Sequence, residues 1–133
     1  METKQTRFER VMLIDDNSID LFVASRVMAK NNFAGQTLQF NAAGDALQYL
    51  RVNSANPSAL PQIILVDIYM PVMSGFGFME AYRELPDSVR NGTMVYIVSS
   101  SIDETDIARA GADRNITAFQ EKPVTAAFLN AIN

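Results

Sequence analysis

The stretch IILVDIYMP, residues 63–71, contains the clearest local indication of the fold. Four apolar residues, three of them β-branched, run without interruption and stop at Asp67. An unbroken apolar run of this length is typical of a strand that is covered on both faces, as strands in parallel sheets are. We therefore predict a buried strand over residues 63–66, with a carboxylate at its carboxyl end.

Similar runs on either side predict further strands at residues 10–14, 37–40, 94–98 and 116–119. The segments between and after the strands have helical periodicity, with apolar residues three and four positions apart. The predicted inward faces are Ile19, Phe22, Val23 and Val27; Ala43, Ala46, Leu47 and Leu50; Phe78, Met79, Tyr82 and Leu85; and Val124, Ala127, Phe128 and Ala131.

The remaining segments complete a regular alternation of strands and helices. A weaker helix is predicted at residues 104–110, Pro86 is expected to end the helix before it, and residues 53–61 are predicted to form a plain loop. This alternation indicates an α/β fold with a parallel sheet and helices on both faces. Right-handed crossovers favour a doubly wound, five-stranded, flavodoxin-like sheet in the order 2-1-3-4-5. We expect residues 1–133 to form a single domain with no output domain attached.

Composition excludes several classes of function. The chain has no cysteine and no histidine, which argues against disulfides, a Ser-His-Asp hydrolase and a zinc enzyme. Its net charge is −4, and the sequence shows no cluster of basic residues of the kind that binds nucleic acid. No run approaches the roughly 18 apolar residues of a membrane span, and the first ten residues do not form a signal peptide. We expect a soluble, cytoplasmic protein.

Polar residues stand at the ends of four predicted strands. Asp15 and Asp16 follow the first strand, Asp67 the third, Ser99 the fourth and Lys122 the fifth. Because these strand ends open onto the same edge of the sheet, the side chains should converge. Clustered carboxylates repel one another unless a cation intervenes, and oxygen ligands suit Mg²⁺. A carboxylate in such a site can also act as a nucleophile in phosphoryl transfer.

Each of these residues also has an ordinary structural explanation. Asp16 can cap a helix, Asp67 can cap a turn, and Lys122 can lie in a solvated loop. Ser99 is unremarkable at a strand end, and Phe119 by itself fits a core position. Only their joint occurrence at the ends of the predicted strands favours a site.

The pattern resembles the receiver domain of bacterial response regulators over residues 9–132. That family has an acidic pair after its first strand, a D-x-x-M-P phosphoacceptor segment, a Thr or Ser after its fourth strand, an aromatic switch position and a K-P pair. The matching positions here are Asp15 and Asp16, the segment from Asp67 to Pro71 with Gly75 beyond it, Ser99, Phe119, and Lys122 with Pro123.

The resemblance implies a role for each position. Asp67 would accept a phosphoryl group from a histidine kinase or phosphotransfer protein, and Lys122 would pair with that group. Asp16, Asp67 and the backbone carbonyl of Tyr69 would bind Mg²⁺, with Asp15 acting through water. The bond between Lys122 and Pro123 would be cis.

The resemblance also implies a switch and a determinant of signal lifetime. Ser99 would donate a hydrogen bond to a phosphoryl oxygen, which leaves space for Phe119 to turn inward. Tyr69 and Ser101 would border the approach of water to the phosphorylated aspartate. We expect the bulky Tyr69 to shield it; the alternative is that Tyr69 is a surface contact for a partner.

The sequence departs from the family pattern in three places. The connection at residues 111–117 is longer than the family usually has, and Tyr69 is bulkier than the residue often found two places after the acceptor. The last predicted helix is short, which suggests missing residues.

Two competing functions also remain. An aspartate-nucleophile phosphatase usually carries D-x-D on its first strand, whereas Asp15 and Asp16 are adjacent and Tyr69 stands two places after Asp67. A flavodoxin-like cofactor binder needs a phosphate loop after the first strand, where DDNSID would repel phosphate.

Overall fold

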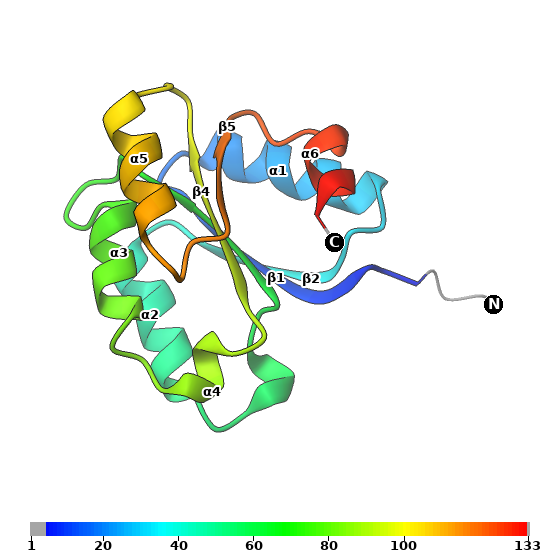
Figure 1. Cartoon of the computed structure of the whole chain (residues 1–133). Helices are drawn as coiled ribbons and strands as arrows, with labels where there is room; N and C mark the ends of the chain where they lie inside the picture. The colour runs from blue at the N-terminus through cyan, green and yellow to red at the C-terminus, as the bar shows by residue number, and fades with distance from the viewer. Residues whose placement is uncertain (1–4, 133) are drawn as a thin grey trace.

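Five parallel strands form the centre of the protein in the computed structural model, which describes residues 5–132 (Figure 1). Their order confirms the predicted 2-1-3-4-5 arrangement. The strands, in that spatial order, are β2 (Ala34–Phe40), β1 (Phe8–Ile14), β3 (Ile63–Asp67), β4 (Met94–Ser99) and β5 (Ala118–Glu121).

The central strand β3 is buried along its whole length, as its apolar run predicted. Its backbone pairs with β1 on one side and β4 on the other, so that Val66 is aligned with Ile14 and with Ile97. This register brings the carboxyl ends of the three strands level with one another. Asp67 is the last residue of β3 and lies opposite Val98.

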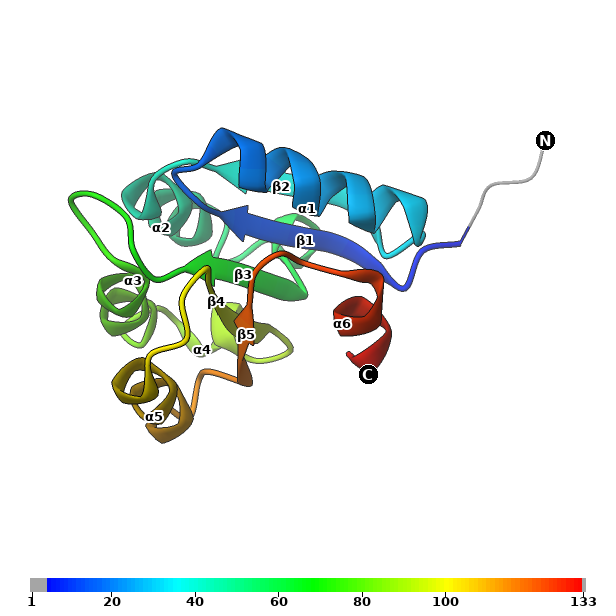
Figure 2. The ribbon, with the colours of Figure 1, turned by 90° about the horizontal axis from the view of Figure 1, so that it is seen from above.

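Helices cover both faces of the sheet (Figure 2). Two hydrophobic clusters, one on each face, account for the core. On one face lie α1 (Ser18–Lys30) and α6 (Ala126–Ala131); on the other lie α2 (Ala43–Val52), α3 (Gly75–Tyr82), α4 (Asp87–Arg90) and α5 (Glu104–Ala112). No helix within residues 5–132 is long and apolar enough to cross a membrane.

The predicted inward face of α1 is wrong at Ile19 and Phe22, whereas Val23 and Val27 are half-buried. Ile19 and Phe22 are 70% and 62% exposed, whereas Leu21, Ala24 and Met28 are buried. Both sets have helical spacing, so periodicity could not choose between them. The buried set was selected by packing against apolar side chains of the preceding strand β1 and of β3, which lies much further along the chain.

The last helix, α6, also buries a different face from the one predicted. Val124 is buried and Phe128 half-buried as predicted, but Ala127 and Ala131 are exposed. Leu129 and Ile132 are buried instead, in the same cluster as the inward side chains of α1. The larger side chains bury more apolar surface than alanine does, which favours this rotation.

Strand β5 begins two residues later than predicted. Ile116 is buried, but it belongs to a turn in which its N–H donates to the carbonyl of Asp113 at 3.1 Å. The ladder with β4 starts only where Ala118 faces Tyr96. An apolar residue in a turn can fill the core without joining the sheet, and the local pattern does not distinguish the two cases. Strands β1 and β2 begin earlier than expected, at Phe8 and Ala34.

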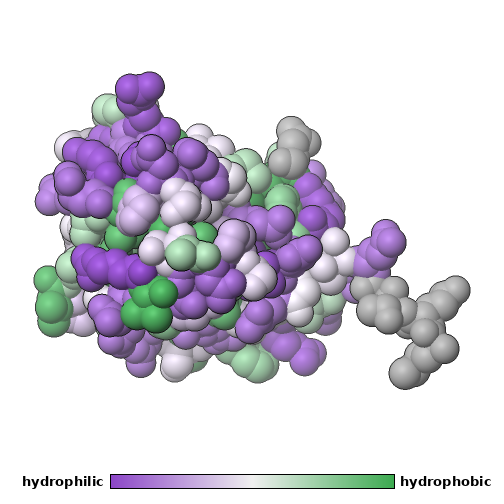
Figure 3. Space-filling model, turned by 90° about the horizontal axis from the view of Figure 1, so that it is seen from below, coloured by the Kyte–Doolittle hydropathy of each residue, from purple (hydrophilic) through white to green (hydrophobic). Residues whose placement is uncertain are grey.

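Two short helical segments were not predicted. A 3₁₀ turn, Pro57–Ala59, lies within the expected loop, and α4 follows Pro86. The helix α3 ends at Tyr82, and Leu85 is buried from the connection rather than from the helix. Figure 3 shows the face of the molecule that contains α4 as mostly hydrophilic, with small separate hydrophobic patches. Scattered apolar side chains of this kind are normal on a protein surface.

Candidate functional site

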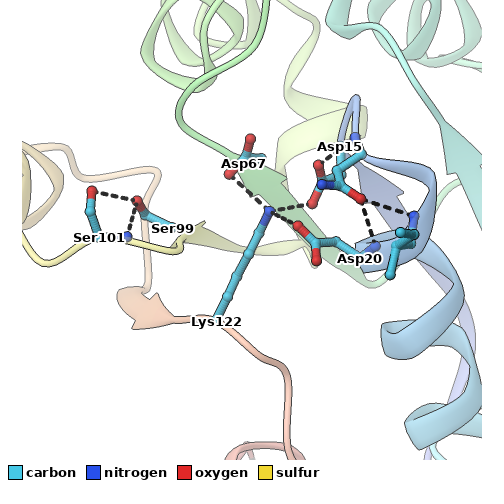
Figure 4. A network of polar contacts seen from close by, with 8 residues as sticks. Asp15, Asp20, Asp67, Ser99, Ser101 and Lys122 are labelled. Carbon is cyan, nitrogen blue, oxygen red and sulfur yellow. Dashed lines mark hydrogen bonds and ion pairs between the residues drawn. The ribbon is translucent and has the colours of Figure 1, made fainter.

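The carboxylates of Asp15, Asp16 and Asp67 and the ammonium of Lys122 converge as predicted. The Ser99 side chain does not join them, and Figure 4 shows it directed toward Ser101. The Nζ of Lys122 lies 3.1 Å from Oδ1 of Asp67 and 2.5 Å from Oδ2 of Asp15. The carboxylate oxygens of Asp15, Asp16 and Asp67 lie within 4.8 Å of one another. These side chains line a hollow of about 280 Å³, together with Asn17, Asp20, Tyr69 and Ser100.

Local backbone interactions place the acidic pair. The N–H of Asp15 donates to the carbonyl of Phe40 on β2 at 3.0 Å, and its Oδ1 accepts from the N–H of Asn17 at 2.9 Å. The Asn17 side chain then caps α1 by accepting from the N–H groups of Ile19 and Asp20. The helix cap is therefore Asn17, and the carboxylate of Asp16 is left exposed toward the hollow.

Asp67 is held by a close approach of two backbone segments. Gly75, the first residue of α3, donates its N–H to the carbonyl of Ile68 at 2.8 Å. A Cβ atom at Gly75 would lie only 2.5 Å from the carbonyl oxygen of Asp67, so only glycine fits here without displacement. The N–H of Ile68 in turn donates to Val98 at 3.2 Å. These contacts hold in place the segment from Asp67 to Gly75, which begins at the carboxylate predicted to accept the phosphoryl group.

Sequence reasoning missed one member of the site, Asp20. Its Oδ2 lies 2.9 Å from Nζ of Lys122, which is thus shared by three carboxylates. The sequence does place Asp20 four residues after Asp16, in the first turn of α1. An acidic residue in the first turn of a helix is, however, common for electrostatic reasons alone, so the pattern did not single it out.

Burial and charge shift the titration of the two central groups in ways that fit this arrangement. Burial, together with the charges of Asp15 and Asp16, outweighs the attraction of Lys122 and raises the pKa of Asp67 to about 6. Burial alone would lower the pKa of Lys122, but its hydrogen bonds to Asp15 and Asp20 and the charge of Asp67 raise it. The ammonium therefore stays charged, while the carboxylate cluster carries more negative charge than one ammonium balances.

The raised pKa of Asp67 predicts an unusual pH dependence of stability in metal-free protein. Its folded pKa of about 6 exceeds its unfolded value, so the native state binds more protons between pH 4 and 6, and stability falls as pH rises through this range. Replacing Asp67 with Asn should remove this loss. We expect the advantage of the variant to grow by about 2 kcal/mol between pH 4.5 and 7.5.

Urea unfolding of both proteins with a chelator present, at the two pH values, measures this difference. Carboxylates that do not interact with Asp67 cancel in the comparison, because they titrate alike in both proteins. An advantage that is constant, or that shrinks with rising pH, would show that Lys122 already neutralises the cluster.

The two switch candidates lie on adjacent strands. Ser99 is fully buried at the end of β4, where its Oγ accepts from the N–H of Ser101 at 3.2 Å. Its carbonyl accepts from the N–H of Lys122 at 2.8 Å, which joins the ends of β4 and β5. Phe119 is half-buried on β5 opposite Ile97 and packs against the cluster beneath α5.

Tyr69 borders the hollow and is 56% exposed. Its phenol donates a hydrogen bond to Asp106 in α5, and this bond raises the pKa of Tyr69.

The bond between Lys122 and Pro123 is cis, as predicted. The expected long connection after residue 110 is shorter than predicted, because α5 extends to Ala112.

Comparison with known proteins points to one family. Residues 11–132 match the family described as the response regulator receiver domain. The protein PilH of Pseudomonas aeruginosa is 26% identical over 127 residues, which cover 92% of this chain and 96% of PilH. The probable methanogenesis regulatory protein FilR2 of Methanothrix harundinacea is 23% identical and covers 86% of this chain, which spans 72% of FilR2.

Solved structures show the same fold. A two component response regulator from Cytophaga hutchinsonii superposes with a TM-score of 0.87 at 27% identity, over 93% of this chain and 92% of that one. A response regulator receiver protein from Dyadobacter fermentans gives a TM-score of 0.81 at 31% identity, over 91% of each chain.

Proposed function

The chain belongs to the family of response regulator receiver domains, and from this premise we propose that Asp67 receives a phosphoryl group from a histidine kinase or phosphotransfer protein. One observation carries the assignment to Asp67: its buried carboxylate lines an acidic hollow, 3.1 Å from the ammonium of Lys122. The other residues of the site then have distinct roles around it.

Asp67 acts as the nucleophile in this proposal. One of its carboxylate oxygens forms a bond to phosphorus as the bond between phosphorus and the donor nitrogen breaks. Such transfers need positioning and charge neutralisation more than proton transfer, so the lack of histidine in this chain is no obstacle. Lys122 supplies fixed positive charge beside the acceptor.

The acidic hollow fits Mg²⁺. Three carboxylates within 4.8 Å of one another are hard oxygen donors. Their mutual repulsion, which adds to burial in raising the pKa of Asp67, favours a bound cation. We propose Asp16, Asp67 and the carbonyl of Tyr69 as ligands. Both oxygens of Asp15 already accept hydrogen bonds, which supports its acting through water. When bound, the ion neutralises charge on the phosphoryl oxygens.

The direct test is phosphate uptake by the purified protein. Incubation with acetyl phosphate and Mg²⁺ should add the mass of one phosphoryl group, and a phosphorylated histidine protein should deliver it to the same residue. Chelation of the metal should reduce uptake by at least about tenfold, because the cation offsets repulsion between the acceptor and the incoming phosphate. Uptake that is absent, or equally fast without divalent metal, would contradict the proposal.

We also propose that Ser99 and Phe119 transmit phosphorylation to α5 and β5. The Ser99 hydroxyl now lies near Ser101, with 3.5 Å between the two Oγ atoms. A phosphoryl oxygen on Asp67 would offer it a charged acceptor, worth roughly 1.5–3 kcal/mol. A two-state equilibrium would shift by roughly ten- to a hundredfold, with Phe119 turning toward the vacated space.

Ser99→Ala should therefore take up phosphate but lose most of the conformational response. NMR spectra of α5 and β5 with beryllofluoride measure that response, and Ser58→Ala, which removes an exposed hydroxyl far from the hollow, is the control. Full wild-type shifts in Ser99→Ala would exclude the hydroxyl as the coupling group.

The proposed activity is signalling rather than turnover of a separate substrate. The chain would catalyse only its own phosphorylation and dephosphorylation, and act through contacts with other proteins. We place it in the cytoplasm, because the kinase that charges the donor histidine draws on ATP. A phosphatase is disfavoured by Tyr69, which stands where such an enzyme would carry its second, acid-base aspartate.

A further inference from the structure

Tyr69 connects the phosphoacceptor loop, which we define as the segment between Asp67 and Gly75, to α5. Its phenol donates a hydrogen bond to Oδ2 of Asp106, which lies 37 residues further along the chain, in the first turn of that helix. The turn is itself well held, because Oδ1 of Asp103 accepts from the N–H groups of Thr105 and Asp106 at 2.8 and 3.3 Å. The exposed phenol therefore has a fixed anchor on a different element.

The same side chain forms part of the wall of the acidic hollow. Tyr69 stands two residues after Asp67, and it borders the hollow together with Ser100 and Lys122. More than half of its surface is exposed, so core packing does not determine its rotamer. An exposed aromatic side chain without a polar partner samples several staggered rotamers. The bond to Asp106 restricts Tyr69 to the rotamer that lies between the hollow and α5.

We propose that Asp106 is a positioning residue, which holds Tyr69 beside the hollow and thereby slows hydrolysis of phosphorylated Asp67. This inference rests on the proposed function and extends it to α5. In the hydrolysis, a water oxygen forms a bond to phosphorus as the bond between phosphorus and the Asp67 oxygen breaks. The products are the Asp67 carboxylate, inorganic phosphate and one proton released to solvent. A side chain held near the approach of water lowers the rate of this step.

A consequence is that the position of α5 controls how long the phosphoryl group persists. The helix carries one end of the hydrogen bond and the phosphoacceptor loop carries the other. Any protein that binds α5 and shifts its first turn would release Tyr69 and shorten the signal. A partner that holds the turn in place would preserve the signal.

The linkage is reciprocal, because one hydrogen bond joins the two segments. Loss of the phenol should loosen the first turn of α5 even without phosphate. This gives a measurement that does not depend on metal or phosphoryl transfer.

The experiment compares the decay of the phosphorylated state in single and double variants. After labelling with acetyl phosphate and removal of the donor, decay is followed by intact mass. Tyr69→Phe and Asp106→Ala should each shorten the half-life by about three- to tenfold, the effect of losing one hydrogen bond that holds a side chain in place. The double variant should decay no faster than either single variant, since both remove the same bond.

Two matched variants separate positioning from general effects. Glu104→Ala removes the same charge from the same exposed helical turn without touching Tyr69 and should decay at the wild-type rate. Asp106→Asn keeps an acceptor oxygen and should restore most of the wild-type half-life. Amide exchange of Thr105 and Asp106 in unphosphorylated protein should quicken in Tyr69→Phe and not in Glu104→Ala.

The outcomes are distinguishable. If Asp106→Ala decays at the rate of Glu104→Ala, or if the two single effects add in the double variant, the positioning role is refuted while the phosphoacceptor function stands. If wild-type protein takes up no phosphate, the proposed function itself fails and takes this inference with it. Equal, non-additive effects with rescue by Asp106→Asn would establish the role.

Discussion

Asp67→Asn should abolish phosphorylation, with uptake from acetyl phosphate falling below about one per cent of wild type because an amide is not a nucleophile at this position. The substitution is nearly isosteric, and Asp67 is buried beside Lys122, so the variant should fold. The removal of one of three repelling carboxylates should even stabilise metal-free protein at neutral pH. Loss of uptake together with retained stability would therefore identify the acceptor rather than a damaged fold.

Asp20→Asn is the matched control for this substitution. Asp20 also contacts Nζ of Lys122, at 2.9 Å, but lies on α1 and outside the cluster of carboxylates suited to a metal ion. It should keep the phosphoacceptor and take up one phosphoryl group. If Asp67→Asn still gains a phosphoryl group under Mg²⁺ while Asp20→Asn does not, the acceptor has been misassigned.

Gly75→Ala should be among the most damaging single substitutions in the chain, at a cost of about 2–4 kcal/mol in the free energy of unfolding. The new methyl group would lie 2.5 Å from the carbonyl oxygen of Asp67 and 3.0 Å from Cα of Ile68, both of which are backbone atoms. Neither can rotate away as a side-chain end could. Relief would require α3 to move away from the carboxyl end of β3, and the hydrogen bond from Gly75 to Ile68 would lengthen.

This substitution should impair function as well as stability, because the displaced segment carries Asp67. Urea unfolding measures the first effect, and phosphate uptake under conditions where the variant is folded measures the second. Gly44→Ala, in the first turn of α2, is the control. Nothing lies within 4 Å of its added Cβ, so the variant should lose no stability and should take up phosphate normally. Equal stability of the two variants would contradict the close approach at Gly75.

Much of the fold was predictable because its signals are local. An apolar run such as residues 63–66 specifies a buried strand through the burial of its own side chains. The alternation of strands and helices, with right-handed crossovers, leaves few possible orders for the sheet. Errors occurred where two local patterns were equally good, as in α1, where the stripe through Ile19 and Phe22 competed with the stripe through Leu21 and Met28.

The sequence by itself determined that Asp15, Asp16, Asp67 and Lys122 would meet, because parallel strands bring their carboxyl ends to one edge whatever the details of packing. Tertiary structure alone decided which stripe of α1 is buried, that Asp20 shares Lys122, and that Tyr69 reaches Asp106. Each of these depends on contacts between residues far apart in the chain. Their free energies arise only once the sheet has placed the helices, so no local spacing encodes them.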